Sequence, residues 1–217
     1  MKGLLIKDFC LMKGQKNFFF LIIAVTLGIT VFGDDMTFAL GFLTFVVSLF
    51  SLSTISYDEF DNGNAFLFTL PFTRTRYAVE KYVLALLLGG AGWILSTGTV
   101  ILVNVYKDVL SISDITISAF MIIPAMLIIQ AIMIPFHLKF GGEKGRLAII
   151  GALGVVFALG AVIVKIADGM NVNLMTMLNG LTTINVTTML VILFLIALLI
   201  WGISMMVSIS VMRKKEF

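Results

Sequence analysis

Long apolar stretches separated by short polar segments run through the whole sequence. A helix needs about 20 mostly apolar residues to cross the hydrocarbon core of a bilayer. Runs such as 190–200 lack the alternation of apolar and polar residues that a membrane β-strand requires. The pattern therefore predicts an all-α membrane protein, a single transmembrane domain over 1–217. The six predicted spans are 17–33, 36–56, 82–106, 116–137, 147–165 and 188–212.

Composition agrees with lipid as the solvent for most of the chain. Hydrophobic residues make up 60% of the 217 residues and charged residues 12%. Typical soluble proteins have about 45–50% and about 25%. The mean hydropathy is +1.11. The single cysteine, Cys10, excludes an internal disulfide and a cysteine-based metal site.

Basic residues predict the orientation of the spans. If the N-terminus lies inside the cell, only Lys107 and Lys165 of the fifteen Lys and Arg residues fall on the outer side. This distribution follows the positive-inside rule, so we expect both termini in the cytoplasm. Residues 1–16 would then form a basic interfacial helix with Leu5, Phe9 and Met12 on one face, or else a frayed topology signal. The outer segment 168–187 would form a capping helix or a plain loop.

The cores of the predicted spans hold no Asp, Glu, Lys or Arg, since Lys165 stands at the outer end of its span, and the only histidine, His137, lies at an inner end. Ion-coupled carriers normally need a buried carboxylate, so the sequence disfavours that class. An H-E-x-x-H motif and paired carboxylates are also missing from the spans, and we expect no enzymatic activity in this chain. Mild polarity remains, either as a path for a hydrophobic substrate or as hydrogen bonds that pack the helices. The candidate path residues are Ser48, Ser51, Ser96, Gln130 and Ser204.

Glycines in the third predicted span indicate close helix packing. Gly89, Gly90 and Gly92 are followed by Ser96, four residues after Gly92. Such small residues let two helices approach closely. The contact is either intramolecular or a seam between two copies of the chain.

The segment 57–81, between the second and third spans, is longer than the two to eight residues that a helix hairpin needs. It opens acidic, and Pro71 must stop any helix that forms after the turn at 62–64. Thr73 can then cap a helix that starts at Arg74 and carries Arg76, Tyr77 and Lys81 to the membrane interface. We expect a short helix that exposes Phe66, Phe68 and Leu70, as a partner site or as an interfacial helix.

Motifs in both inner loops resemble those of the ABC-2 type transporter permeases of bacteria. The first loop carries S-Y-D-E at 56–59, L-P-F-T-R at 70–74 and Y-A-V-E-K-Y at 77–82. The second carries P-F-H-L-K-F-G at 135–141, followed by E-K-G-R, and the opening L-L-I-K-D at 4–8 also matches. Within the family, the chain is similar to small permeases that export amphipathic peptides, such as the phenol-soluble-modulin exporters.

The resemblance implies an ABC-2 (type V exporter-like) fold in a bacterial plasma membrane. Two such subunits, as a homodimer or heterodimer, would pair around a pathway for amphipathic peptides or lipid-like cargo, with no nucleic acid involved. Each would dock one of two separate ABC ATPases through a coupling helix in 57–81. The sequence has no G-x-x-x-x-G-K-S/T motif, so ATP and Mg²⁺ would bind to the ATPase. The alternative is a non-transport scaffold or a toxin-immunity protein.

The resemblance also implies which residues transmit the conformational change of the ATPase to the membrane helices. One set lies in and around the first inner loop, and a second contact lies in the second inner loop. The first set is Asp58, Glu59, Phe66, Leu70, Pro71, Arg74 and Arg76, and the second is Lys139, Glu143, Lys144 and Arg146.

Overall fold

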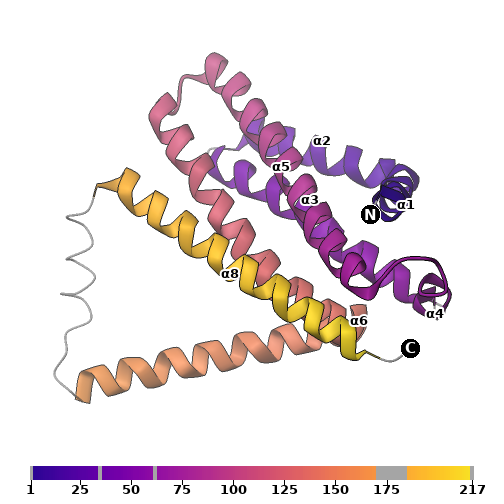
Figure 1. Cartoon of the computed structure of the whole chain (residues 1–217). Helices are drawn as coiled ribbons and strands as arrows, with labels where there is room; N and C mark the ends of the chain where they lie inside the picture. Colours follow the sequence, from indigo (N-terminus) through magenta and orange to yellow (C-terminus); the bar gives the residue numbers. More distant parts are fainter. Residues whose placement is uncertain (1, 34–35, 61–62, 170–184, 216–217) are drawn as a thin grey trace.

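The computed structural model describes residues 2–33, 36–60, 63–169 and 185–215, with the backbone alone at 65, 143, 145–149, 151–164 and 166–169. These residues form helices and no strand (Figure 1), which confirms the all-α prediction. The helices are α1 (Lys2–Gly14), α2 (Lys16–Phe32), α3 (Met36–Glu59), α4 (Gly63–Leu67), α5 (Arg74–Lys107), α6 (Ile112–Gly169) and α8 (Val186–Lys214).

Four helices are long and apolar enough to cross a membrane, namely α3, α5, the first part of α6 (Ile112–Gly142) and α8. A fifth crossing is possible if α1 and α2, which meet at 69°, count as one broken span. The chain is therefore a multi-pass membrane protein. The predicted span 147–165 lies in the second part of α6, where most side chains are outside the described set, so the count of six stays a prediction.

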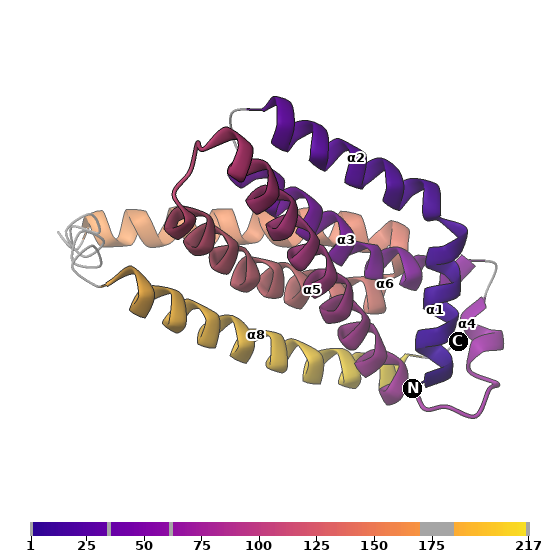
Figure 2. The same ribbon diagram turned by 90° about the horizontal axis from the view of Figure 1, so that it is seen from above.

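The predicted second inner loop reduces to a sharp kink at Gly141. The backbone is helical on both sides of this residue, and Gly141 itself has φ 80° and ψ 177°. Only glycine adopts this combination readily, because a Cβ would clash with the backbone. After the kink, α6 runs back toward the opposite end of the bundle (Figures 1 and 2).

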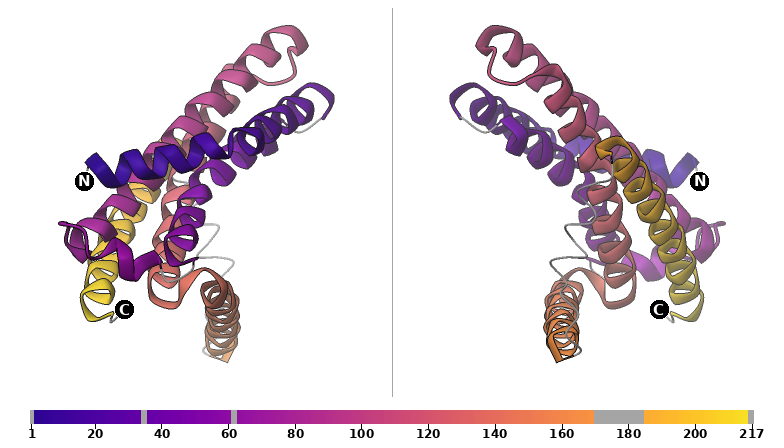
Figure 3. Two further views of the ribbon diagram at one scale, coloured as in Figure 1. Left: turned by 90° about the vertical axis from the view of Figure 1, so that its right-hand side faces the viewer. Right: turned by 90° about the vertical axis from the view of Figure 1, so that its left-hand side faces the viewer.

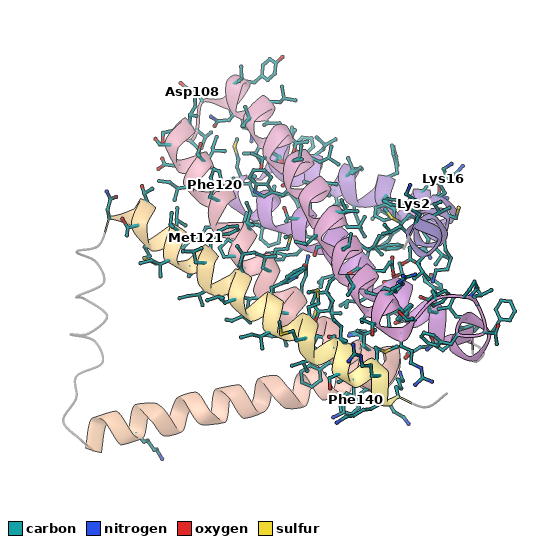
Figure 4. All side chains as sticks on the ribbon, in the orientation of Figure 1. Lys2, Lys16, Asp108, Phe120, Met121 and Phe140 are labelled. Atoms are coloured by element: carbon teal, nitrogen blue, oxygen red, sulfur yellow. The ribbon has the colours of Figure 1, made fainter. Side chains whose placement is uncertain are left out.

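Both chain termini and α4 lie at one end of the bundle, which we call the loop end (Figure 2). The C-terminal end of α2 and the α5–α6 connection lie at the opposite, far end. In the side-chain view, Lys2, Lys16 and Phe140 mark the loop end and Asp108 the far end (Figure 4). The termini thus share a side, as expected, although their cytoplasmic location stays a prediction.

The helix α3 forms the centre of the bundle, and α8 lies at its edge. In the apolar stretch of each helix that could cross the membrane, 61% of the residues of α3 are buried but only 11% of those of α8. Figure 3 shows α1 crossing the ends of the longer helices rather than running beside them. The largest apolar cluster lies at the loop end and joins α1, α3, α4, α5, α6 and α8. Its buried members are Leu4, Leu52, Ile55, Leu67, Tyr77, Ala78, Tyr82, Ala85, Ile134, Leu138 and Met212.

Some glycines of α5 pack closely against neighbouring helices, whereas others have open space beside them. A Cβ on Gly92 would lie 3.2 Å from the Leu43 carbonyl oxygen and 3.2 Å from Thr44 Cα, both backbone atoms of α3. A Cβ on Gly89 would meet Met126 of α6, whereas one on Gly90 would have no described atom within 4 Å. Gly89 and Gly92 therefore serve intramolecular packing.

We expect Gly92→Ala to lower the free energy of unfolding by about 1–2 kcal/mol, because the α3 backbone must move to admit the methyl group. Gly90→Ala is the matched control, and we expect it to be neutral or stabilising, since alanine is the better helix former. Denaturation by sodium dodecyl sulfate in mixed micelles, followed by tryptophan fluorescence, measures both. Equal effects at the two positions would contradict the close approach of α5 to α3.

Candidate functional site

The segment between α3 and α5 forms a short helix followed by a turn. The helix α4 ends at Leu67, before Pro71, and α5 begins at Arg74. The side chain of Thr73 caps α5 by accepting a hydrogen bond from the backbone N–H of Arg76 at 3.3 Å. This confirms the predicted cap and helix start.

Apolar side chains are exposed on this segment, although not all that the sequence suggested. Phe66 is 72% exposed and Leu70 43% exposed. Phe68 is half-buried instead, with its ring centroid 5.5 Å from that of Tyr77. The expectation for Phe68 was wrong because α4 ends at Leu67, and the chain then turns Phe68 toward α5. The pair Phe66 and Leu70 remains as the exposed apolar patch, which we call the α4 patch.

Buried charges lie behind this segment, where α1 covers the ends of α3 and α5. Lys81 is fully buried and donates hydrogen bonds to Asp8 at 2.6 Å and to Thr54 at 3.0 Å. Its Nζ also lies 2.9 Å from Asp58. Lys81 therefore faces the protein interior, and its depth relative to the membrane interface stays a prediction.

Asp58 belongs to this same cluster rather than to the exposed surface. The whole residue is only 8% exposed, and its carboxylate accepts a hydrogen bond from the Tyr77 hydroxyl at 2.9 Å. Lys7 of α1 also donates to it. We call Lys7, Asp8, Asp58, Glu80 and Lys81 the buried charge cluster. A role of Asp58 in coupling would therefore be indirect, through the positions of α1 and α5.

The buried side of α1 differs from the predicted one. Leu4 and Asp8, one helical turn apart, are its buried residues, whereas Phe9 is 45% exposed. The predicted face through Phe9 was therefore wrong in part, because Lys81 provides a partner that lets Asp8 face inward. The signal in the sequence was the pairing of K-D at 7–8 with E-K at 80–81, each within the first eight residues of its helix.

A second set of polar contacts joins four helices at the loop end. Glu59 accepts hydrogen bonds from Lys215 at 2.9 Å and from the backbone N–H of Gly142 at 3.0 Å. Arg74 donates to the backbone carbonyl oxygens of Arg213 and Lys215. The end of α3, the kink of α6, the end of α8 and the start of α5 are thereby tied together.

The other predicted coupling residues are exposed wherever the structure describes their side chains. Pro71, Arg76, Lys139 and Lys144 are exposed. The side chains of residues 143 and 146 are outside the described set. None of these positions is part of the buried charge cluster.

The predicted path residues are buried, and all but Ser51, which bonds within α3, hydrogen-bond to a neighbouring helix. Gln130 donates to Ser48 at 2.7 Å and to the Ala85 carbonyl oxygen at 3.0 Å, and Ser204 shares a 2.7 Å hydrogen bond with Tyr82. Ser51 donates to the Ser48 carbonyl oxygen at 2.9 Å. Ser96 and Thr44 are likewise paired, at 3.1 Å. These are the contacts of helix packing, and the path role stays a prediction.

Two apolar cavities flank the far half of the first part of α6. One, of about 480 Å³, lies against α8 and includes Phe120, and the other, of about 510 Å³, lies against α3 and includes Met121 (Figure 4). Among the described residues, no group of three or more His, Cys, Asp or Glu side chains is arranged to hold a metal ion.

Comparison with known proteins identifies the family. No curated protein matches the chain, and no solved structure matches it either. A family model described as "ABC-2 family transporter protein" matches residues 3–213, which is nearly the whole chain. This range includes the loop between α3 and α5 and the kink of α6. The chain is therefore a member of the ABC-2 family of transporter proteins.

Proposed function

We propose that this chain is the permease subunit of an ATP-driven exporter in a bacterial plasma membrane, with both termini in the cytoplasm. Two permease subunits would form the pathway, and two separate ABC ATPase subunits would bind and hydrolyse ATP. The observation that carries the proposal is the α4 patch: Phe66 and Leu70 are exposed at the loop end of a membrane bundle. Exposed apolar residues rimmed by charge are typical of partner sites.

The contacts behind the α4 patch support a mechanical role for it. On one side the buried charge cluster ties α3 and α5 to α1, through Asp58 and Lys81. On the other side Glu59 ties the end of α3 to the kink of α6 and to Lys215. A displacement of α4 would therefore move the ends of four long helices and α1 together, as in other rigid-body switches.

The proposed cargo is an amphipathic peptide or a lipid-like molecule. Its support is the absence of charge from the cores of the predicted spans, together with the apolar cavities beside α6. Stimulation of ATP hydrolysis in the reconstituted complex tests this cargo class. We expect amphipathic helical peptides to stimulate hydrolysis, whereas stimulation by small hydrophilic solutes alone would contradict it.

Phe66→Asp is expected to abolish the association with the ATPase. An apolar anchor at the centre of an interface typically contributes about 2 kcal/mol or more, so the affinity should fall by more than about tenfold. Phe66 is 72% exposed, so the change should leave the fold intact. The measurement is the amount of P-loop ATPase that co-purifies with the tagged chain in mild detergent.

Tyr106→Asp is the matched control, because Tyr106 is 90% exposed and lies near Asp108 at the far end. It should leave the recovered ATPase unchanged. If the wild-type chain carries no ATPase from its native membrane, a scaffold or toxin-immunity protein becomes the better proposal. Equal recovery with Phe66→Asp and the wild type would show that the ATPase docks elsewhere.

A further inference from the structure

The carboxyl group of Glu80 has an unusual environment within the buried charge cluster. The side chain is fully buried, and neither of its oxygen atoms has a hydrogen-bond partner among the described residues. Its nearest cation is Lys81, at 3.7 Å. That ammonium is already committed to Asp8 at 2.6 Å and to Asp58 at 2.9 Å. An ionised Glu80 would therefore be a buried charge with little compensation.

Asp8 provides the complement to Glu80. One of its carboxylate oxygens, Oδ2, binds Lys81, whereas Oδ1 is buried without a hydrogen bond in the part of the chain that the structure describes. Lys7 lies 3.1 Å from Oδ1, as an ion pair only. The two carboxyl groups flank one cation, because the Lys81 ammonium lies 2.6 Å from Asp8 and 3.7 Å from Glu80. A single proton between them would satisfy oxygen atoms on both.

The charge count points to the same proton. The groups that face Glu80 are Lys7 and Asp8 from α1, Asp58 from α3, and Tyr77 and Lys81 from α5. Tyr77 is neutral and donates its hydroxyl hydrogen to Asp58. Three carboxyl groups therefore face two ammonium groups, and one proton balances the cluster. Two carboxylates that share a buried site do not both ionise readily.

We propose that Asp8 and Glu80 form a proton-binding site, and that the shared proton holds α1 against α5. When the proton leaves, the cluster keeps one uncompensated negative charge, and the contact between α1 and α5 weakens. The site thus makes the docking of α1 depend on the proton concentration at the loop end. It stands independently of the proposed export function, since it needs only this chain.

The position of Glu80 favours proton exchange near neutral pH. α5 has 34 residues, more than the about 20 that a crossing needs, and Glu80 precedes its apolar stretch 82–106. Burial raises the pKa of Glu80 from its ordinary 4.5 to about 7, and the neighbouring Asp8 carboxylate adds to this rise against the opposing effect of Lys81. Because the folded state binds the proton more tightly than the unfolded chain, folding stability falls as the pH rises from about 4.5 to about 7.

A spin label on Cys10 measures the docking of α1 directly. Cys10 is the only cysteine of the chain, is exposed, and lies two residues after Asp8. In the purified wild-type chain in nanodiscs, the label should become more mobile as the pH rises from 6 to 8.5, and the thermal unfolding midpoint should fall. In Glu80→Gln, which mimics the protonated acid, both should be independent of pH, and at pH 8.5 the midpoint should exceed that of the wild type.

Glu59→Gln is the matched control, because Glu59 is a carboxylate with two donors, Lys215 and the Gly142 N–H. It should retain the wild-type pH dependence. Infrared difference spectra between pH 6 and 8.5 should also show the carbonyl stretch of a protonated carboxylic acid in the wild type but not in Glu80→Gln. If that stretch persists in Glu80→Gln, or if the label on Cys10 responds to pH in this variant as in the wild type, the proposal is wrong.

Discussion

Lys81→Met is expected to lower the free energy of unfolding by about 3–5 kcal/mol, the usual cost of removing one partner from a buried ion pair. Methionine retains the volume of the lysine stem but removes the ammonium group. Asp8 then loses its 2.6 Å partner, and Asp58 loses one at 2.9 Å. Both carboxylates would stay enclosed between α1, α3 and α5, where water cannot replace the lost cation.

Titration with sodium dodecyl sulfate measures this loss, and Lys139→Met is the matched control. Lys139 is exposed at the same end of the bundle, so the same chemical change there should cost less than about 1 kcal/mol. Adding Asp8→Asn to Lys81→Met should recover part of the stability, because the double variant has one fewer buried carboxylate that lost its partner Lys81. A loss at Lys81 no larger than that at Lys139 would mean that Lys81 reaches water.

Helix positions could be predicted from the sequence because each depends on local chemistry. The predicted spans 36–56 and 188–212 lie within α3 and α8, since an apolar stretch of about 20 residues has few alternatives in lipid. The start of α5 could be predicted for the same reason. Pro71 stops a helix that comes before it, and Thr73 caps the helix that begins at Arg74. These features need no knowledge of the rest of the fold.

The buried charge cluster could not be predicted in the same way. Lys81 and Glu80 stand beside an apolar span, where charged residues normally mark the membrane interface. Their burial arises from a contact between residues 8 and 81, which requires α1 to turn by 69° relative to α2 and cross the bundle. Phe66 and Phe68 illustrate the same limit, because one is exposed and the other half-buried only through the point at which α4 ends.

The two sets of contacts at the loop end differ in how far water can replace a side chain that is removed by mutation. In the buried charge cluster, Lys81 is fully enclosed, and its loss cannot be compensated by solvent. In the second set, the Lys215 and Glu59 side chains are 24% and 19% exposed, so water can partly replace either partner. What fixes that second set is therefore the backbone, above all the kink that brings the Gly142 N–H to Glu59.

Gly141→Ala tests this dependence on the kink, and we expect it to lower the free energy of unfolding by about 2–3 kcal/mol. A non-glycine residue at φ 80° and ψ 177° carries about 1–3 kcal/mol of backbone strain. In addition, the new Cβ would lie 2.5 Å from Glu59 Oε2, so Glu59 must move away from the Gly142 N–H. The strain and the weakened hydrogen bond act in the same direction.

Gly202→Ala is the control for Gly141→Ala. Gly202 lies within α8, and no described atom outside its own helix backbone would lie within 4 Å of a Cβ there. Alanine at this position should be neutral or stabilise the chain by up to about 1 kcal/mol. If Gly141→Ala proves as harmless as Gly202→Ala, α6 does not fold back at Gly141. Glu59 would then be held by Lys215 alone, and movement of α4 would not reach α6 through Glu59.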